Sequence, residues 1–108
     1  MKQGEMELQL GPDKITLRAT PHALRTVLSK HEDLRTALQR VYMMNDSIMY
    51  DIIEAAVSDG KKAINREALQ TNVFEYGIIN LVEPLTEYLM LLANGGKPVE
   101  GESDEKKA

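Results

Sequence analysis

Two short stretches near the start of the chain alternate between apolar and polar residues, and this pattern constrains the fold more than any other feature. Residues 5–10 place Met, Leu and Leu at every second position, and residues 15–20 do the same with Ile, Leu and Ala. A period of two puts alternate side chains on opposite faces of a β-strand. Residues 11–14, Gly-Pro-Asp-Lys, suit a tight turn because proline presets the φ angle that a turn requires. We predict a β-hairpin over residues 5–20 with one apolar face.

A hairpin by itself is marginally stable in water, so its apolar face must pack against the rest of the chain. The apolar residues that follow recur at helical spacing. Thr20 supplies a capping hydroxyl and Pro21 suits the first helical position, where no N–H is needed. A polar stretch at 29–33 divides the apolar pattern. We therefore predict either one long helix or two helices, at about 21–30 and 33–44.

Two further helices are predicted in the middle of the chain. Residues 45–47, Asn-Asp-Ser, would cap the first of them, and Asp59-Gly60 would end it. Asn65 would cap the next helix, with Ile64 packing on Leu69 as a hydrophobic staple.

The last helix is the most apolar segment. Its apolar residues step by four, three, four and three positions, which is a heptad-like stripe: Ile78, Val82, Leu85, Leu89 and Leu92. Gly77 would separate this helix from the preceding one, and Pro84 should kink or interrupt it. Residues 94–96, Asn-Gly-Gly, would end it.

These elements predict an α+β fold, in which an N-terminal β-hairpin is followed by a bundle of four to five helices. We expect a single globular domain over residues 1–96, with the hairpin at 5–20 and helices within 21–95. Residues 97–108 have no periodicity and one bulky apolar side chain, so we expect a disordered polar tail.

Composition excludes several classes of function. The chain has no cysteine, so it forms no disulfide and no zinc–thiolate site, and a reducing cytoplasm is favoured. Its net charge of −4 argues against nonspecific binding to nucleic acid. No apolar run follows the first lysine, so no signal peptide is expected. The apolar segment 76–92 carries Glu83 and Glu87 near its centre, which argues against a membrane span.

No group of residues predicts an enzyme. His22 and His31 have no second histidine or cysteine at ligand spacing, so both are interpreted as structural. The carboxylates around the helix at 46–59, and the Glu83–Glu87 pair, are interpreted as solvated helix faces. No nucleophile or phosphate-loop motif occurs. We predict no catalytic residue, cofactor or metal site.

A DNA-reading helix-turn-helix is the weakest alternative. Helices near 46–59 and 65–76 could resemble one, and the second would then present Arg66 outward. It also carries Glu67 and Glu75, whose charges disfavour a contact with phosphate.

The remaining candidate is an apolar contact surface on the last helix. A small domain has limited room for a helix that is apolar almost all round, so part of this helix is expected to face another chain, either a copy of itself or a client. The residues chosen for this core-or-contact stripe are Ile78, Val82, Leu85, Leu89 and Met90. The methionines support an adaptable surface, because their side chains repack easily.

Several motifs, in this order, resemble the small tail assembly chaperones of long-tailed phages and gene transfer agents. They are the Gly-Glu-Met-Glu-Leu start at 4–8, the Leu-Arg-Ala-Thr run at 17–20, Ala23-Leu24, and a Gly77-led helix that closes in Leu-Leu-Ala-Asn-Gly-Gly at 91–96. The resemblance covers roughly residues 4–96. The family often has a glycine where the first helix ends, whereas residues 29–33 contain none.

The resemblance implies a phage or prophage protein that binds the tape-measure protein while the tail tube polymerises around it. It implies the cytoplasm of a bacterial host, and as partners the tape-measure protein or other tail proteins, with homo-oligomers possible. The alternative is another tail structural protein, or a small non-enzymatic helical adaptor that dimerises through its C-terminal helix.

Overall fold

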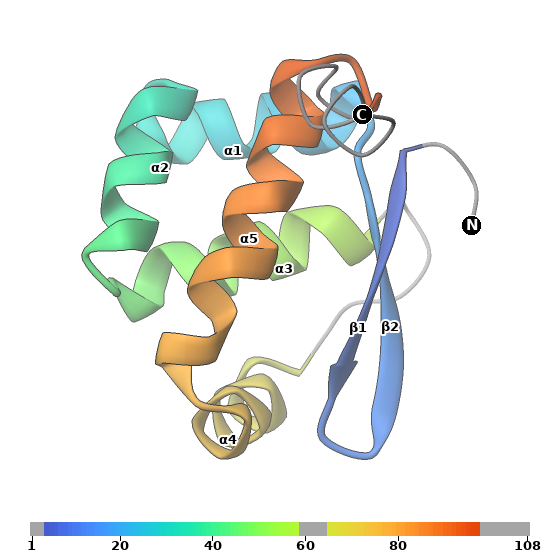
Figure 1. Ribbon diagram of the computed structural model, residues 1–108, viewed down its shortest axis with the longest axis vertical. Coiled ribbons are helices and arrows are strands. Elements are labelled where there is room, and N and C mark those ends of the chain that lie inside the picture. Colours follow the sequence, from blue (N-terminus) through green and yellow to red (C-terminus); the bar gives the residue numbers. More distant parts are fainter. Residues whose placement is uncertain (1–3, 59–64, 98–108) are drawn as a thin grey trace, which may run out of the picture.

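A two-stranded antiparallel hairpin and five helices make up the parts of the chain that the computed structural model describes, residues 4–58 and 65–97 (Figure 1). Their order is β1 (Glu5–Leu10), β2 (Asp13–Arg18), α1 (Pro21–His31), α2 (Leu34–Tyr42), α3 (Asp46–Ser58), α4 (Arg66–Tyr76) and α5 (Ile78–Ala93). The predicted α+β class is confirmed, with the hairpin first and the helices after it.

The hairpin closes through a two-residue turn, because Leu10 pairs with Asp13 across Gly11 and Pro12. Gly11 has a φ of 68°, which a type II′ turn requires at its first central position and which favours glycine. A Cβ atom at Gly11 would lie 2.5 Å from Oδ1 of Asn72. The tip of the hairpin is therefore in close contact with α4.

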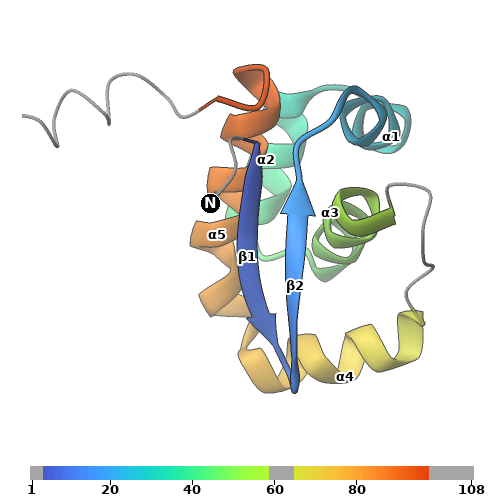
Figure 2. The same cartoon turned by 90° about the vertical axis from the view of Figure 1, so that its right-hand side faces the viewer.

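The apolar face of the hairpin is buried against the helices. Leu8, Leu10 and Leu17 are at most 5% exposed, and the other inward residues are partly buried. Figure 2 shows β1 in front of α5 and α3 beside β2, with α4 crossing behind the tip of the hairpin. This burial supplies the partner that an isolated hairpin lacks.

All seven elements contribute to one core. Its most deeply buried large side chains are Leu17, Val27, Val41, Ile48, Met49, Ile52, Ile53, Val73, Leu81, Leu85, Tyr88 and Leu89. Only one of them is aromatic, so the core is built mainly from aliphatic side chains and one methionine.

The polar stretch at 29–33 divides the first helical region into two helices, which settles the alternative that the pattern left open. Thr20 caps α1 by accepting a hydrogen bond from the Ala23 N–H at 3.0 Å. Asp33 caps α2 in the same way through the Thr36 N–H at 2.7 Å, and this bond lowers the pKa of Asp33. Between the helices Glu32 has a φ of 68°, a conformation that favours glycine.

The predicted caps of the next two helices are confirmed. The side-chain oxygen of Asn45 accepts from the Ile48 N–H at 3.2 Å, and that of Asn65 accepts from the Ala68 N–H at 3.1 Å. The predicted helix end at 59–60, the contact of Ile64 with Leu69 and the tail beyond Lys97 lie outside the described residues.

Gly77 separates α4 from α5 as predicted, with a φ of 96°. Pro84 lies inside α5 and does not interrupt it, so that part of the expectation is wrong. Proline removes one N–H, which would have bonded to the Asn80 carbonyl, and Asn80 is exposed to water. The neighbouring Leu81 and Leu85 are fully buried and hold the helix against the core on both sides of the proline.

Tyr88 joins the last helix to the hairpin. Its ring is fully buried, and its hydroxyl donates a hydrogen bond to the Arg18 carbonyl at the end of β2. Burial raises the pKa of Tyr88, because the phenolate would lose its hydration.

We predict that Tyr88→Phe lowers the free energy of unfolding by about 1 kcal/mol, the usual net contribution of one hydrogen bond. The ring and its packing remain, so the fold should persist. Urea denaturation followed by circular dichroism measures the change. Tyr42→Phe is the matched control, because Tyr42 is 61% exposed and should show no change. Equal stability of Tyr88→Phe and the wild type would contradict the assigned bond.

Alkaline pH provides a second test of the same residue. The folded protein holds the Tyr88 proton more tightly than the unfolded chain does, so the unfolded chain loses it first as pH rises above about 10. The contribution of protonated Tyr88 to the free energy of unfolding is therefore complete below about pH 10 and decreases above it. We expect the stability of the wild type to fall more steeply above pH 10 than that of Tyr88→Phe, as measured by urea denaturation at each pH.

Candidate protein-binding surface

The structure distributes the five predicted contact residues between core and surface. Leu85 and Leu89 are buried in the core, and Ile78 and Val82 are partly buried against it. Met90 is 38% exposed and is the one clearly accessible residue of the five. Most of the heptad-like stripe therefore serves the interior of this chain, because α5 packs against each of the other four helices.

Other apolar side chains are far more accessible. Six large apolar residues are exposed in the described part of the chain, and we call them the exposed apolar set: Tyr42, Met43, Met44, Phe74, Ile79 and Met90. Phe74 is 82% exposed and Met43 79% exposed. Single exposed apolar side chains are ordinary, but several large ones on neighbouring elements are typical of a contact surface.

Helix geometry explains why Phe74 and Ile79 are exposed. The buried residues of α4 are Leu69 and Val73, four positions apart on one face. Phe74 follows Val73 and is rotated from it by about 100° around the helix. Ile79 has the same relation to Ile78 at the start of α5. The signal that could have found both is an apolar residue out of step with the helical period of its neighbours.

The end of α2 presents three members of the set in succession. Met44 adopts a φ of 58°, and the N–H of Asn45 bonds to the Arg40 carbonyl at 3.0 Å, which closes the helix in a Schellman motif. Glycine is the usual residue at this position, and a side chain there costs about 1–2 kcal/mol. Met44 therefore destabilises this helix end relative to glycine, and it adds apolar area to the surface.

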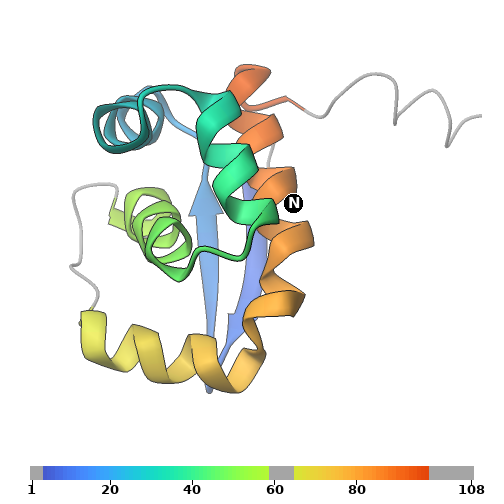
Figure 3. The same ribbon diagram turned by 90° about the vertical axis from the view of Figure 1, so that its left-hand side faces the viewer.

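The elements that carry the set lie on one side of the molecule. Figure 3 shows α2 and α5 next to each other on the face toward the viewer, with the junction of α4 and α5 below them. The α2–α5 packing brings segments about 40 residues apart in sequence to this side. The contact stripe predicted from the sequence includes Met90 alone of the six, because this adjacency is tertiary.

A polar cluster occupies a different region, where α1, α2, α3 and α4 meet. Nε2 of His31 lies 2.9 Å from Oδ2 of Asp51, and Nη1 of Arg40 lies 2.7 Å from Nδ1 of His31. Arginine only donates, so Nδ1 accepts and Nε2–H donates to Asp51. Both ring nitrogens are thus occupied, and neither is available as a base. His31 thus links α1 to α2 and α3.

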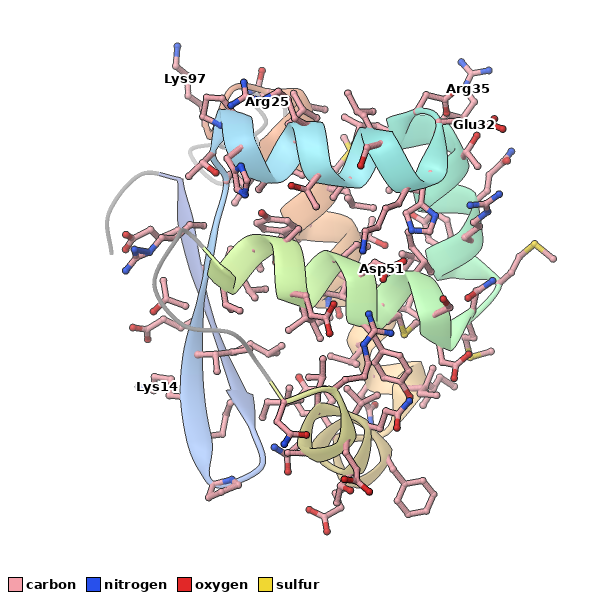
Figure 4. The ribbon with its side chains drawn as sticks, turned by 180° about the vertical axis from the view of Figure 1, so that it is seen from behind. Lys14, Arg25, Glu32, Arg35, Asp51 and Lys97 are labelled. Atoms are coloured by element: carbon pink, nitrogen blue, oxygen red, sulfur yellow. The ribbon has the colours of Figure 1, made fainter. Side chains whose placement is uncertain are left out.

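Asp51 is the centre of this cluster and was misjudged from the sequence. It was interpreted as part of a solvated helix face, but its side chain is only 13% exposed. Besides His31 it lies 3.1 Å from Nη2 of Arg66 and 3.8 Å from Nζ of Lys30. Figure 4 shows Asp51 on α3, between α1 and α4. No sequence pattern indicates that groups from α1 and α4 converge on this carboxylate of α3.

Arg66 is held in place by α3. Its Nε and Nη2 donate to the two carboxylate oxygens of Glu54, each at 2.7 Å, and this pairing raises the pKa of Arg66. Its guanidinium also lies 5.4 Å from the ring centroid of Tyr50. A guanidinium occupied in this way is poorly placed to bind phosphate, which counts against the helix-turn-helix alternative.

The described residues contain no group of three His, Asp or Glu side chains that could hold a metal ion. In the same residues, no helix is both long enough and apolar enough to cross a membrane.

We predict that Asp51→Asn lowers the free energy of unfolding by about 1–3 kcal/mol, because Arg66, Lys30 and His31 all lose a charged acceptor. Thermal and urea denaturation measure the change. Glu75→Gln on α4 is the control: it removes the same charge at an exposed position and should be neutral. A stable Asp51→Asn variant would mean that the cluster contributes no net stability.

Comparison of this chain with protein-family models, with curated proteins and with solved structures finds no match. The exposed apolar set and the motifs in the sequence are therefore the features that bear on function.

Proposed function

We propose that the protein is a phage or prophage tail assembly chaperone that binds the tape-measure protein during tail morphogenesis. The observation that carries this proposal is the exposed apolar set at the end of α2 and on α4 and α5. Burying such a surface against a partner is favourable by about 25 cal/mol per Å² of apolar area. A protein that acts by contact needs this kind of surface, and a reactive group is not required.

The composition of the set supports a chaperone in particular. Three of its six members are methionines, Met43, Met44 and Met90. Methionine is flexible and polarisable, so it adapts to partners of varied shape and is common on surfaces that bind several sequences. A tape-measure protein is a long helical polymer, and its successive segments differ in detail.

The net charge and the expected affinity are consistent with a chaperone that binds its client reversibly. The chain has a net charge of −4, which would keep a coated client in solution. Exposed side chains spread over three helices form modest contacts, and many copies on one client would add their effects. Such binding allows the chaperone to leave when the tail tube replaces it.

An adaptor that dimerises through its C-terminal helix is less well supported. The apolar stripe of α5 is used inside the chain, since Leu81, Leu85 and Leu89 are buried. Ile79 and Met90 are the exposed large apolar residues of this helix. The alternative is another tail structural protein. Gene position distinguishes the two functions, because a chaperone gene should lie between a tail-tube gene and the long tape-measure gene.

The direct test is co-expression with fragments of the tape-measure protein encoded in the same phage or prophage. We expect the wild type to keep the fragment in the supernatant after centrifugation. Phe74→Ser combined with Ile79→Ser should weaken binding by about tenfold or more, because two large apolar contacts are lost. The soluble fraction of the fragment and its co-purification with the chaperone are the measurements.

The matched control combines Gln70→Ser with Glu75→Ser, two exposed polar positions on α4. This variant should hold the fragment as well as the wild type does. A fragment that precipitates equally with and without the wild-type protein would refute the proposal. Equal activity of both double variants would show that the apolar set is not the contact surface.

A further inference from the structure

The outer edge of β1 has backbone groups that the hairpin does not use. Gly4 and Ala19 lie opposite each other, one step beyond the Glu5–Arg18 pair at the open end of the hairpin. The Ala19 N–H donates to the Gly4 carbonyl at 2.8 Å, so Gly4 and Ala19 form a hydrogen-bonded pair. Hydrogen-bonded pairs alternate in an antiparallel ladder. The backbone N–H and C=O groups of Glu5, Glu7 and Gln9 therefore point away from β2. Among the described residues β1 has no other strand beside it.

A groove of about 630 Å³ runs along this edge. Its walls are the β1 edge on one side and one flank of α5 on the other, with Tyr76 of α4 at its end. The polar residues that line it are Glu7, Gln9, Asn80, Glu83 and Glu87. Figure 2 shows the free edge of β1 beside α5. An extended peptide in this groove would lie next to unpaired strand groups, as in β-strand addition.

The groove is rich in hydrogen-bond acceptors. Glu83 and Glu87 are exposed on the α5 flank, and neither forms an ion pair with another described residue. The Asn80 carbonyl receives no N–H from Pro84. Glu7 lies 3.6 Å from Lys14, but both side chains are about half exposed, so this pair is weak. Among the described residues, no lysine or arginine lines the groove.

From this edge and its charge we infer that the groove binds an extended segment of another protein, which adds to β1 as a third strand. Lysine or arginine side chains of that segment face Glu83 and Glu87. A second copy of this chain fits poorly, because antiparallel pairing of two β1 edges would bring the carboxylates of Glu5 and Glu7 together. The inference is independent of the proposed function, since none of the exposed apolar set lines this groove.

The probe is a blocked eight-residue peptide that alternates lysine and threonine, with a glutamate–threonine peptide as its charge control. Fluorescence anisotropy measures affinity, and amide hydrogen exchange reports on the strand edge. We expect the basic peptide to bind and to slow exchange at Glu7 and Gln9, while the acidic peptide does not bind. Glu83→Gln combined with Glu87→Gln should weaken binding about tenfold.

Three variants separate groove binding from general attraction. Glu67→Gln with Glu75→Gln makes the same charge change on α4 and should leave affinity unchanged. Gln9→Pro removes one edge N–H, without affecting the hairpin bonds, and should abolish binding, whereas Gln9→Thr keeps the N–H and should bind. Phe74→Ser with Ile79→Ser should bind the peptide normally, so failure of this inference is distinct from failure of the chaperone proposal.

Several outcomes would overturn the inference: no binding of the basic peptide, equal weakening by the two charge-changing pairs, or unchanged exchange at Glu7 and Gln9 when the peptide is bound. Slow exchange at this edge that depends on protein concentration without peptide would identify a second copy as the occupant and would also overturn it. If Gln9→Pro does not fold, the exchange data on the wild type still decide the question.

Discussion

Burial of the hairpin's apolar face is the interaction on which the rest of the structure depends. Two strands alone are marginally stable in water, and here Leu8, Leu10 and Leu17 are covered by the helices. Tyr88 adds a directional bond from α5 to the end of β2. The hairpin in turn buries the apolar faces of α3 and α5 that lie against it.

The two polar features of the molecule follow from how the helices converge. Asp51 receives groups from α1 and α4, and through His31 it is linked to Arg40 of α2, so the helix ends are joined by charge as well as by apolar packing. The groove beside β1 has the opposite character. Its carboxylates face water and a free strand edge, so they are available to a partner.

The exposed apolar set and the groove beside β1 have different residues and differ chemically. The exposed apolar set suits a helical client of varied sequence, and the acidic edge of β1 suits an extended basic segment. A small protein that offers both could hold one partner by apolar contact and another by strand addition. Neither surface needs a reactive group.

Local sequence determined the elements of this protein, and only the tertiary structure decided which side chains remain exposed. The alternation at 5–10, the caps at Thr20, Asn45 and Asn65, and the glycine at 77 predicted the hairpin and the helices, because each acts within a few residues of chain. The contact stripe was not predictable in the same way. Its periodicity marks one apolar face but does not say whether that face meets another part of the same chain or a partner, and packing against the other helices placed most of it in the core.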